Sequence, residues 1–280
     1  IALTSTLCKL LERVLNTRLL DWLEKKHFGR IQSGGMKNRS TMDHLIRLEG
    51  AVRKAFVRNE HMIAIFFDLE KAYDMTWRHG ILADLYDLGL RGRLAVFIQN
   101  FLKQRNFRVR VNNYVSAKHR QENGIPQGSI LSVTLFIIKV NSLIDQIPVN
   151  NKTLASLYMD DLQISYSDPS LGTVVSKLKF ILEKIGTWAD LNGFRFSPSK
   201  TVAVHFQEMN RTLQEQPAPL QIGGHVIKYK DNTRFLGLIF DRNMRWNINI
   251  NSLKAKCHRV LGLRRTLCSS QWGADEKTLL

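Results

Sequence analysis

The chain has 280 residues, of which 44% are hydrophobic and 23% charged, an ordinary globular composition that argues against disorder. Its 41 Lys and Arg outnumber 24 Asp and Glu, which gives a formal net charge of +17 and favours nucleic acid over an anionic membrane surface as partner. No apolar run approaches the roughly 20 residues that span a bilayer, and three cysteines are too few for a disulfide framework. We therefore expect an intracellular, enzyme-sized unit belonging to a longer polyprotein.

Two amphipathic helices and a buried strand are predicted in the N-terminal quarter. Apolar residues recur at helical spacing from Leu7 to Trp22 and again from Met42 to Phe56. Residues 29–40, between them, are rich in Gly, Ser, Asn and basic residues, as in a loop that contacts an anion. The continuous apolar run 62–67 then predicts a strand buried on both faces, which ends at Asp68.

The next sixty residues combine a basic segment with a buried helix. A helix is expected over 81–88 and strand-like alternation over 107–115. Residues 91–120 hold eight Lys or Arg and no acid, which favours a nucleic-acid contact over an ordinary solvated face. After the Pro-Gln-Gly turn, Ser129 is placed to cap a helix over 130–144 that is apolar nearly all round and hence buried.

The C-terminal half begins with an acidic hairpin. Strand-like runs over 154–158 and 162–166 flank Met159, Asp160 and Asp161 at a tip. A strong helix is predicted from 171 to 188, with its stop at Asn192 and Gly193. Further predictions are strands over 194–206 and 220–240, and a basic helix over 242–266 that faces nucleic acid.

The chemistry is expected in three carboxylates, those of Asp68, Asp160 and Asp161. Acids beside apolar strands repel one another and resist ionisation unless a divalent cation neutralises them, and Mg²⁺ prefers such oxygen ligands. Because consecutive strand residues point to opposite faces, both hairpin acids can reach a metal only if the turn redirects one of them, and Asp160 ranks above Asp161 as a ligand. Taken alone, an Asp-Asp pair at a hairpin tip is ordinary turn chemistry; the apolar strand, the Pro-Gln-Gly turn and the basic composition favour catalysis.

Several segments resemble the motifs of reverse transcriptases. The sequence Tyr158-Met159-Asp160-Asp161 resembles their Tyr-x-Asp-Asp signature. Phe67 to Asp74 is similar to their first acidic motif, and Gly124 to Ser129 to their template-and-nucleotide turn. Gln32 to Thr41 is similar to a fingertip motif of LINE-type (non-LTR) elements. Two later motifs are matched by Gly193 to Thr201 and by Arg234 to Gly237. The context around Lys71 and Trp77 most resembles arthropod jockey-like elements.

The resemblance implies an α+β, right-hand polymerase fold with an antiparallel palm sheet backed by helices. Fingers would span 1–60 and 79–124, the palm 61–78 and 125–241, and a partial thumb 242–280. The implied activity is RNA-directed DNA polymerisation of a non-LTR retrotransposon, with two Mg²⁺ ions, replaceable by Mn²⁺, assisting nucleotidyl transfer onto a primer 3′-hydroxyl. The implied partners are an RNA template, a DNA primer, deoxynucleoside triphosphates and a flanking endonuclease or other domain, in the cytoplasm and nucleus.

The resemblance also assigns roles to individual residues. Asp68 and Asp160 would hold both metals, assisted by Asp161 and the Leu69 carbonyl, and the Tyr73 ring would exclude a ribose 2′-hydroxyl. Five further residues would contact the nucleotide or template: Lys37, Arg39, Gln127, Gly128 and Lys200. Three would grip the primer: Phe235, Leu236 and Gly237. Lys71 and Arg78 have two alternative roles: each side chain either contacts nucleic acid or is simply solvated.

One departure and two alternatives qualify this interpretation. Where relatives usually have Phe-Arg after Gln-Ser-Gly, this chain has Gly35-Met36, which removes an aromatic and a cation that would contact the triphosphate or template and predicts weakened but not abolished activity. The alternatives are an RNA-directed RNA polymerase, against which Tyr158 and Tyr73 argue, and a catalytically decayed RNA-binding fragment, against which the three intact acids argue.

Overall fold

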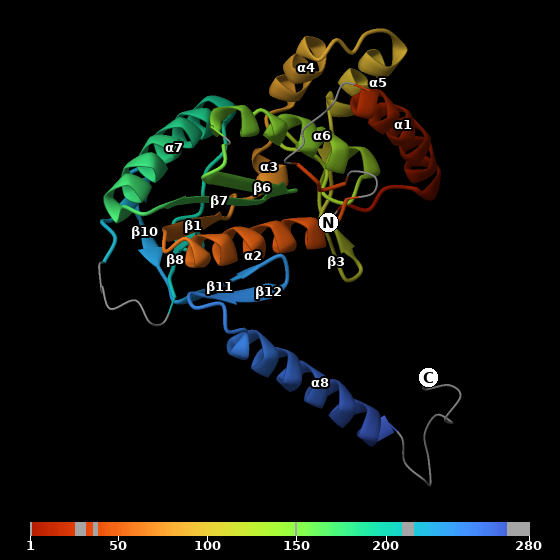
Figure 1. The fold of residues 1–280 in the computed structure, drawn as a ribbon. Helices are drawn as coiled ribbons and strands as arrows, with labels where there is room; N and C mark the ends of the chain where they lie inside the picture. Colours follow the sequence, from red (N-terminus) through yellow and green to blue (C-terminus); the bar gives the residue numbers. More distant parts are fainter. Residues whose placement is uncertain (1, 26–31, 36–38, 149, 209–215, 268–280) are drawn as a thin grey trace.

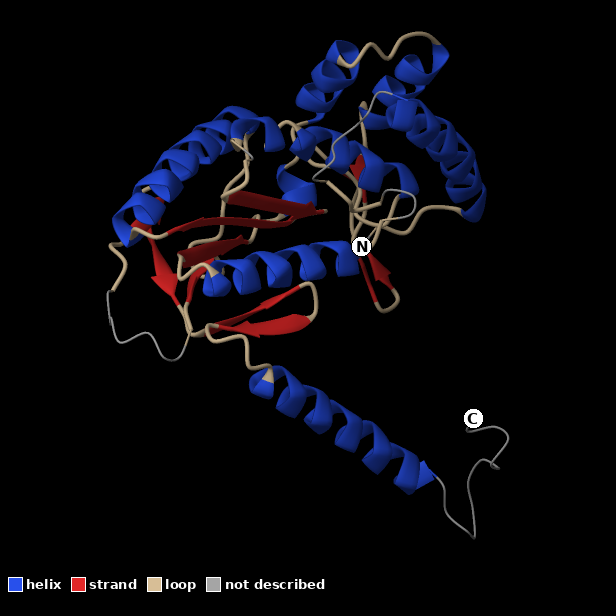
Figure 2. Ribbon diagram, in the orientation of Figure 1, coloured by secondary structure: helices blue, strands red, loops and turns tan. Residues whose placement is uncertain are grey.

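The computed structural model describes residues 2–25, 32–35, 39–148, 150–208 and 216–267. Helices and strands are interspersed along the chain in runs of one or several of each (Figures 1 and 2). The helices are α1 Thr6–Lys25, α2 Thr41–Val57, α3 Ala72–Met75, α4 Arg78–Asp87, α5 Arg93–Leu102, α6 Ile130–Asn141, the 3₁₀ turn Ile144–Gln146, α7 Leu171–Asn192 and α8 Asn247–Leu267. The strands are β1 His61–Phe67, β2 Asn106–Phe107, β3 Arg110–Val111, β4 Tyr114–Val115, β5 His119–Arg120, β6 Thr153–Tyr158, β7 Asp161–Asp168, β8 Val202–Phe206, β9 Leu220–Ile222, β10 His225–Tyr229, β11 Asn232–Phe235 and β12 Leu238–Asp241.

A six-stranded sheet forms the centre, in the order β6-β7-β1-β8-β10-β9. Strand β1 pairs antiparallel with β7 on one side and β8 on the other. The predicted antiparallel sheet is therefore confirmed for its core, with one exception, because β10 runs parallel to β8. The mixture of helices with this sheet agrees with the expected α+β class.

Strand β1 is buried on both faces, as its apolar run predicts. Ile63, Ile65 and Phe67 face a core that includes residues of α6 and α7. The alternate residues, such as Phe66, face a second core formed with α2 and the β11–β12 hairpin. Figure 1 shows α7 on one side of the sheet and α2, with β11 and β12, on the other. Each fully buried large side chain of this kind contributes about 1.5–3 kcal/mol.

Two predicted elements differ from the structure. The strand expected over 194–206 begins only at Val202, because Gly193 has left-handed backbone (φ 72°) and Pro198 lacks the N–H of a ladder residue. The first helix forms as expected, but Leu7, Leu11 and Val14 on its apolar stripe are exposed. Its Leu19 and Leu23 are buried in the main core, and Trp22 packs against that core partly buried. Within the described ranges, no helix is both long and apolar enough to cross a membrane.

The helix predicted after Ser129 begins as expected but has a different cap. Ser129 stands at the N-cap position of α6 without accepting a bond there; its hydroxyl instead donates to the Glu12 carboxylate. The same Glu12 oxygen accepts the backbone N–H groups of Ile130 (2.8 Å) and Leu131 (3.3 Å). Glu12 is 1% exposed and satisfies donors that a helix start leaves unpaired. The sequence signal for this cap is the position of Glu12, an acid seven residues before Leu19 and therefore on the buried face of α1.

We predict that Glu12→Gln lowers the free energy of unfolding by about 1–2 kcal/mol, because the amide keeps one weak acceptor but loses the charge that faces the start of α6. Urea denaturation measures the change. Glu24→Gln, an exposed acid on the same helix, is the matched control and should change stability by less than about 0.5 kcal/mol. Equal effects of the two substitutions would contradict the capping role.

Candidate active site

The three predicted catalytic aspartates lie at the same end of neighbouring strands. Asp68 directly follows β1, and the β1–β7 register pairs Phe67 with Leu162, so the next step of the ladder sets Asp68 opposite Asp161. Asp161 begins β7, and Asp160 lies in the turn that joins β6 to β7. Strand pairing thus brings together Asp68 and Asp161, which are far apart in the sequence.

The acidic turn is short and strained. Tyr158 pairs with Asp161, so only Met159 and Asp160 form the loop. Met159 has φ 58°, a left-handed conformation that costs a non-glycine residue about 1 kcal/mol or more. The turn takes Asp160 off the strand path, which is the redirection that two adjacent acids need in order to face one site.

The Gln-Ser-Gly motif supports this turn from behind. The Gln32 side chain is fully buried, and its Oε1 accepts the N–H groups of Gly34 (2.9 Å) and Met159 (3.3 Å). Ser33 N–H donates to the Leu157 carbonyl at 3.1 Å. A Cβ on Gly34 would lie 2.5 Å from the Met159 nitrogen, so only glycine allows this approach. Sequence reasoning placed the motif at the fingertip and missed this contact, because nothing local in the sequence reveals it.

The carboxylates influence one another electrostatically. Desolvation, followed by the negative charges of Asp160 and Asp68, raises the pKa of Asp161 to about 6. The side chain reaches solvent, yet enough protein surrounds the carboxyl to disfavour its charge. Lys200 offsets part of the negative charge, since its Nζ lies 3.3 Å from Asp68 Oδ2. Lys200, predicted to lie near the triphosphate, is therefore beside the acids.

Tyr73 lies close enough to the acids to sense them. Its pKa is raised by burial and, secondarily, by the charge of Asp160, and its ring stacks on Phe136 with centroids 5.1 Å apart. Ile125 N–H donates to the Tyr73 carbonyl at 2.9 Å. A Cβ on Gly124 (φ +75°) would lie 2.6 Å from the Asp74 carbonyl oxygen. Tyr73, predicted to exclude a ribose 2′-hydroxyl, thus packs directly against Gly124 and Ile125, the first residues of the template-and-nucleotide turn.

The backbone at Leu69 is oriented by its neighbours. Leu69 and Phe196 form an isolated antiparallel bridge, in which Ser197 N–H donates to the Asp68 carbonyl (2.8 Å) and Glu70 N–H to the Arg195 carbonyl (2.9 Å). Since strand carbonyls alternate in direction, the Leu69 carbonyl points away from Phe196, toward the side of β1 where β7 lies. This direction is compatible with the predicted coordination.

Other predicted contact residues are exposed just before the start of a helix. Gln127 and Gly128 are exposed before α6, and Gly128 has φ 108°, which only glycine adopts easily. Arg39 is exposed just before the α2 N-cap, Ser40. Lys37 lies outside the described residues.

The predicted primer grip is the turn of the β11–β12 hairpin. Phe235 pairs with Leu238, so Leu236 and Gly237 form the turn, both with positive φ. The Phe235 side chain is buried against Phe66, with ring centroids 5.3 Å apart. Phe235 therefore anchors the hairpin, and the exposed backbone of Gly237 is the part of the predicted grip that reaches solvent.

The glycine that departs from the family pattern fits its surroundings. Gly35 has φ +67°, and a Cβ there would lie 2.8 Å from Ile137 Cδ1. Restoring an aromatic side chain would strain this backbone and displace Ile137. Met36, the other half of the departure, lies outside the described residues, so the predicted weakening of nucleotide contact stays a prediction.

The donor set suits a hard divalent cation in its chemistry. Among the described residues, no group of three His, Cys, Asp or Glu forms a ready-made metal site. Mg²⁺ does not require one, because one or two carboxylates and substrate phosphates usually complete its octahedron. Desolvation and, after it, the charges of Asp160 and Asp68 raise the pKa of Asp161, and a cation beside these carboxylates would favour their ionised forms.

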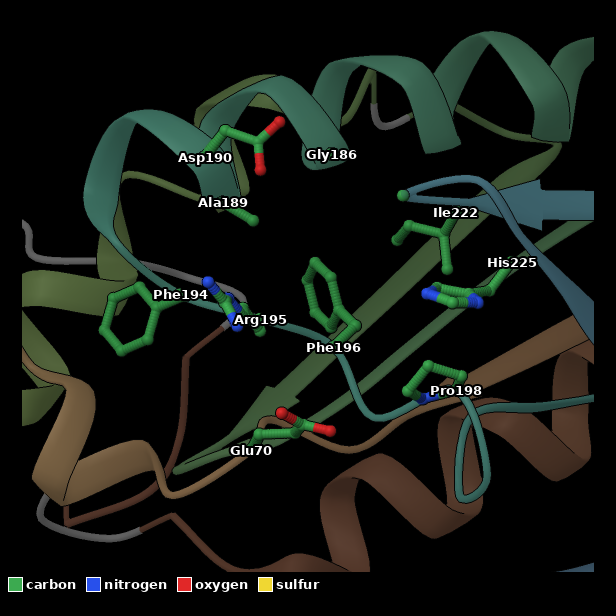
Figure 3. Close-up of a pocket in the computed structure, with 11 residues that line it drawn as sticks. Glu70, Gly186, Ala189, Asp190, Phe194, Arg195, Phe196, Pro198, Ile222 and His225 are labelled. Atoms are coloured by element: carbon green, nitrogen blue, oxygen red, sulfur yellow. The ribbon is translucent and has the colours of Figure 1, made fainter.

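A pocket of about 350 Å³ lies behind the acidic end, between α7, the loop 194–198 and the β9–β10 turn. Figure 3 shows Phe196 in its middle, with Glu70 and Asp190 on opposite sides. None of the described residues to which we assign a site role lines it. The pocket is therefore not lined by the three predicted catalytic aspartates.

Comparison with known proteins agrees with this arrangement. Acids at adjacent strand ends, a tyrosine beside them and a glycine-anchored turn are typical of a template-directed polymerase. Residues 1–240 match the family described as "Reverse transcriptase (RNA-dependent DNA polymerase)", and the chain belongs to that family.

Two similar relatives come from mobile elements of Drosophila melanogaster. The probable RNA-directed DNA polymerase from transposon BS is 26% identical over 95% of this chain and 30% of its own length. The RNA-directed DNA polymerase from mobile element jockey is 26% identical over 90% of this chain and 28% of its own length. These relatives confirm the predicted resemblance to jockey-like non-LTR elements. The chain spans about 30% of their length.

Solved structures confirm the fold class. Apo telomerase from Candida tropicalis superposes with a TM-score of 0.56 at 13% identity, over 83% of this chain and 39% of that one. A form truncated from the C-terminal domain gives 0.55 at 14% identity, over 83% and 43%. At this identity the likeness concerns the α+β polymerase fold alone.

We predict that Asp161→Asn stabilises the metal-free protein at pH 7–8. The raised pKa means that the folded state favours the protonated acid, so the stability associated with this group is greatest below its unfolded pKa and is lost as pH rises through about 6. After discounting for solvent screening, the gain is about 1 kcal/mol. Thermal unfolding in chelator should show it at pH 8 and a shrinking difference towards pH 4, whereas a pH-independent difference would contradict the charge repulsion.

Proposed function

We propose that this chain is the polymerase core of an RNA-directed DNA polymerase of a non-LTR retrotransposon. The observation that carries the proposal is the convergence of Asp68, Asp160 and Asp161 at one end of the sheet, where desolvation and then the charges of the other two raise the pKa of Asp161. Family membership over residues 1–240 and relatives named RNA-directed DNA polymerase support it.

The proposed cofactor is Mg²⁺, as two ions, with Mn²⁺ as substitute. Asp68 and Asp160 would hold them, with Asp161 and the Leu69 carbonyl assisting. When bound, they supply activation of the primer 3′-hydroxyl and stabilisation of charge on the leaving phosphates. The residues of the chain then position substrate: the strained turn and Gln32 fix Asp160, and Lys200 neutralises negative charge beside Asp68.

Tyr73 is the proposed selector of deoxynucleotides. Its ring is fixed from behind by Phe136, and its backbone is held by Ile125, so it cannot easily retreat from an incoming sugar. A fixed ring excludes a 2′-hydroxyl by its size, and its phenol stays neutral because burial raises its pKa. The DNA product therefore depends on this residue.

The proposed partners are an RNA template, a DNA primer and deoxynucleoside triphosphates. The net charge of +17 suits polyanionic partners. A chain that spans about 30% of its relatives is compatible with neighbouring domains in the same polyprotein, such as an endonuclease. The proposed division is fingers over 1–60 and 79–124, palm over 61–78 and 125–241, and the start of a thumb from 242.

We predict that Asp68→Asn reduces primer extension on an RNA template by at least about 100-fold, because a lost ligand removes several kcal/mol of transition-state stabilisation. Mg²⁺ should also raise the melting temperature of the wild type more than that of the variant. Asp87→Asn, an exposed acid on α4, is the control and should match wild type in both measurements. Undiminished synthesis by Asp68→Asn would contradict the metal assignment.

We further predict that Tyr73→Val increases ribonucleotide incorporation relative to deoxynucleotide incorporation by about 10- to 100-fold, since one steric exclusion is worth about 1–3 kcal/mol. Single-nucleotide kcat/KM values for the two sugars measure the ratio. Tyr73→Phe keeps the ring and should keep the discrimination. A wild-type preference for ribonucleotides would instead favour an RNA-directed RNA polymerase.

A further inference from the structure

The basic segment between α5 and the Gly124 turn folds into a free β-ribbon, which we define as residues 105–121. Its root closes where Gln121 N–H donates to the Arg105 carbonyl at 2.8 Å. Its two strand pairs are β2 with β5 and β3 with β4. Figure 1 shows the end labelled β3 projecting away from the body of the molecule.

Apolar and aromatic side chains on the ribbon are exposed. Tyr114 is 84% exposed, and Phe107 is 47% exposed. Val111 pairs directly with Tyr114 and is 63% exposed, so the two form one face at the tip. Alternation of this kind ordinarily places one face of a strand in a core, but here that face meets only solvent and indicates a missing partner.

The same ribbon carries four exposed cations: Arg108, Arg110, Lys118 and Arg120. Within the described part of the chain, none of the four takes part in an ion pair. The sequence holds no acid from 91 to 120, so the ribbon up to Arg120 carries no carboxylate side chain of its own. Exposed rings interleaved with unpaired cations match the chemistry of an unpaired nucleic-acid strand, whose phosphates pair with cations and whose bases stack on rings.

The root of the ribbon is rigid and adjoins the candidate site. The Arg78 guanidinium donates to the carbonyls of Gly124 (2.7 Å), Asn123 (3.1 Å) and Leu102 (3.2 Å). It therefore ties together the segments that enter and leave the ribbon. Burial, with repulsion from Arg105 and Arg120, lowers the pKa of Arg78. Of the two roles considered from sequence, nucleic acid or solvent, Arg78 takes neither.

The segment that leaves the ribbon is also fixed beside the proposed nucleotide gate. Gly124 packs on the backbone of Asp74, and Ile125 bonds to the Tyr73 carbonyl. A strand held on the ribbon would thus be held by an element that is continuous with the wall of the site.

We infer that the ribbon 105–121 binds unpaired RNA, with Tyr114 and Phe107 stacking on bases and the four cations contacting phosphates. A double helix fits less well, because its bases are already stacked on one another and its edges offer these rings little. That the bound strand is the template rests on the proposed function; the binding of RNA does not.

The test measures the affinity of the 280-residue chain for a fluorescent oligouridylate of about 12 nucleotides by anisotropy, over a range of salt concentrations. Tyr114→Ala and Tyr114→Leu should each weaken binding about fivefold or more, since both lose the aromatic face, and Tyr114→Phe should restore it. Arg108→Gln and Arg110→Gln should each reduce the slope of log affinity against log salt by about 0.7.

The matched control substitution lies on α7. Phe180 is 48% exposed and has Lys184 Nζ 4.7 Å from its ring centroid, so Phe180→Ala removes an exposed aromatic beside a cation at a different surface. It should leave affinity and slope unchanged. Equal effects of Tyr114→Ala and Phe180→Ala, or tighter binding of duplex RNA than of oligouridylate, would overturn the inference. Unchanged RNA affinity in all ribbon variants would also overturn it.

Primer extension with the same preparations separates this inference from the proposed function. A wild type that extends no primer but loses RNA affinity on Tyr114→Ala would leave the ribbon assignment intact and refute the polymerase. A wild type that extends a primer, with affinity indifferent to the ribbon variants, would do the reverse.

Discussion

Burial of β1 on both faces is the constraint on which the rest of the structure depends. Its seven residues are all buried, those of one face against α6 and α7 and those of the other against α2 and the β11–β12 hairpin. Burial of this kind fixes the register of the flanking strands, because a slip of one residue would exchange the two faces. The register, in turn, sets Asp68 opposite Asp161, so apolar packing determines where the charges meet.

The charges at that end are unfavourable for folding and useful for chemistry. Three carboxylates gather where desolvation raises the pKa of one of them to about 6, and Met159 adopts a strained conformation beside them. Local strain persists only when its surroundings impose it. Here the buried Gln32 accepts a hydrogen bond from the N–H of the strained residue Met159, and Lys200 supplies a partial countercharge to Asp68. An exposed lysine can leave when a cation or phosphate arrives, whereas a buried partner could not.

The elements with one strong periodicity could be predicted from sequence. Strand β1, helix α7 with its Gly193 stop and the β6–β7 hairpin all formed where local pattern placed them. The three aspartates could be named from their neighbours and from the family motifs. Contacts that join distant segments could not be predicted, because the hydrogen bonds that Gln32 accepts from Met159 N–H and that Arg78 donates to the Asn123 carbonyl depend on which backbone groups the fold leaves unpaired. The exposure of the apolar stripe of α1 could likewise not be predicted, since periodicity identifies an apolar face but not whether another element covers it.

Two buried charges in this chain are satisfied mainly by neutral groups. Glu12 accepts three bonds at the start of α6, and Arg78 donates three to backbone carbonyls; the buried Lys139, by contrast, pairs with Asp84 at 3.0 Å. Neutral groups satisfy a buried charge without requiring a second desolvated ion, whose removal from water costs several kcal/mol. In a chain with 41 basic residues and 24 acidic ones, acids for internal ion pairs are scarce. Using backbone groups instead leaves the surface cations uncompensated, and an uncompensated basic surface is what attracts and holds a polyanion.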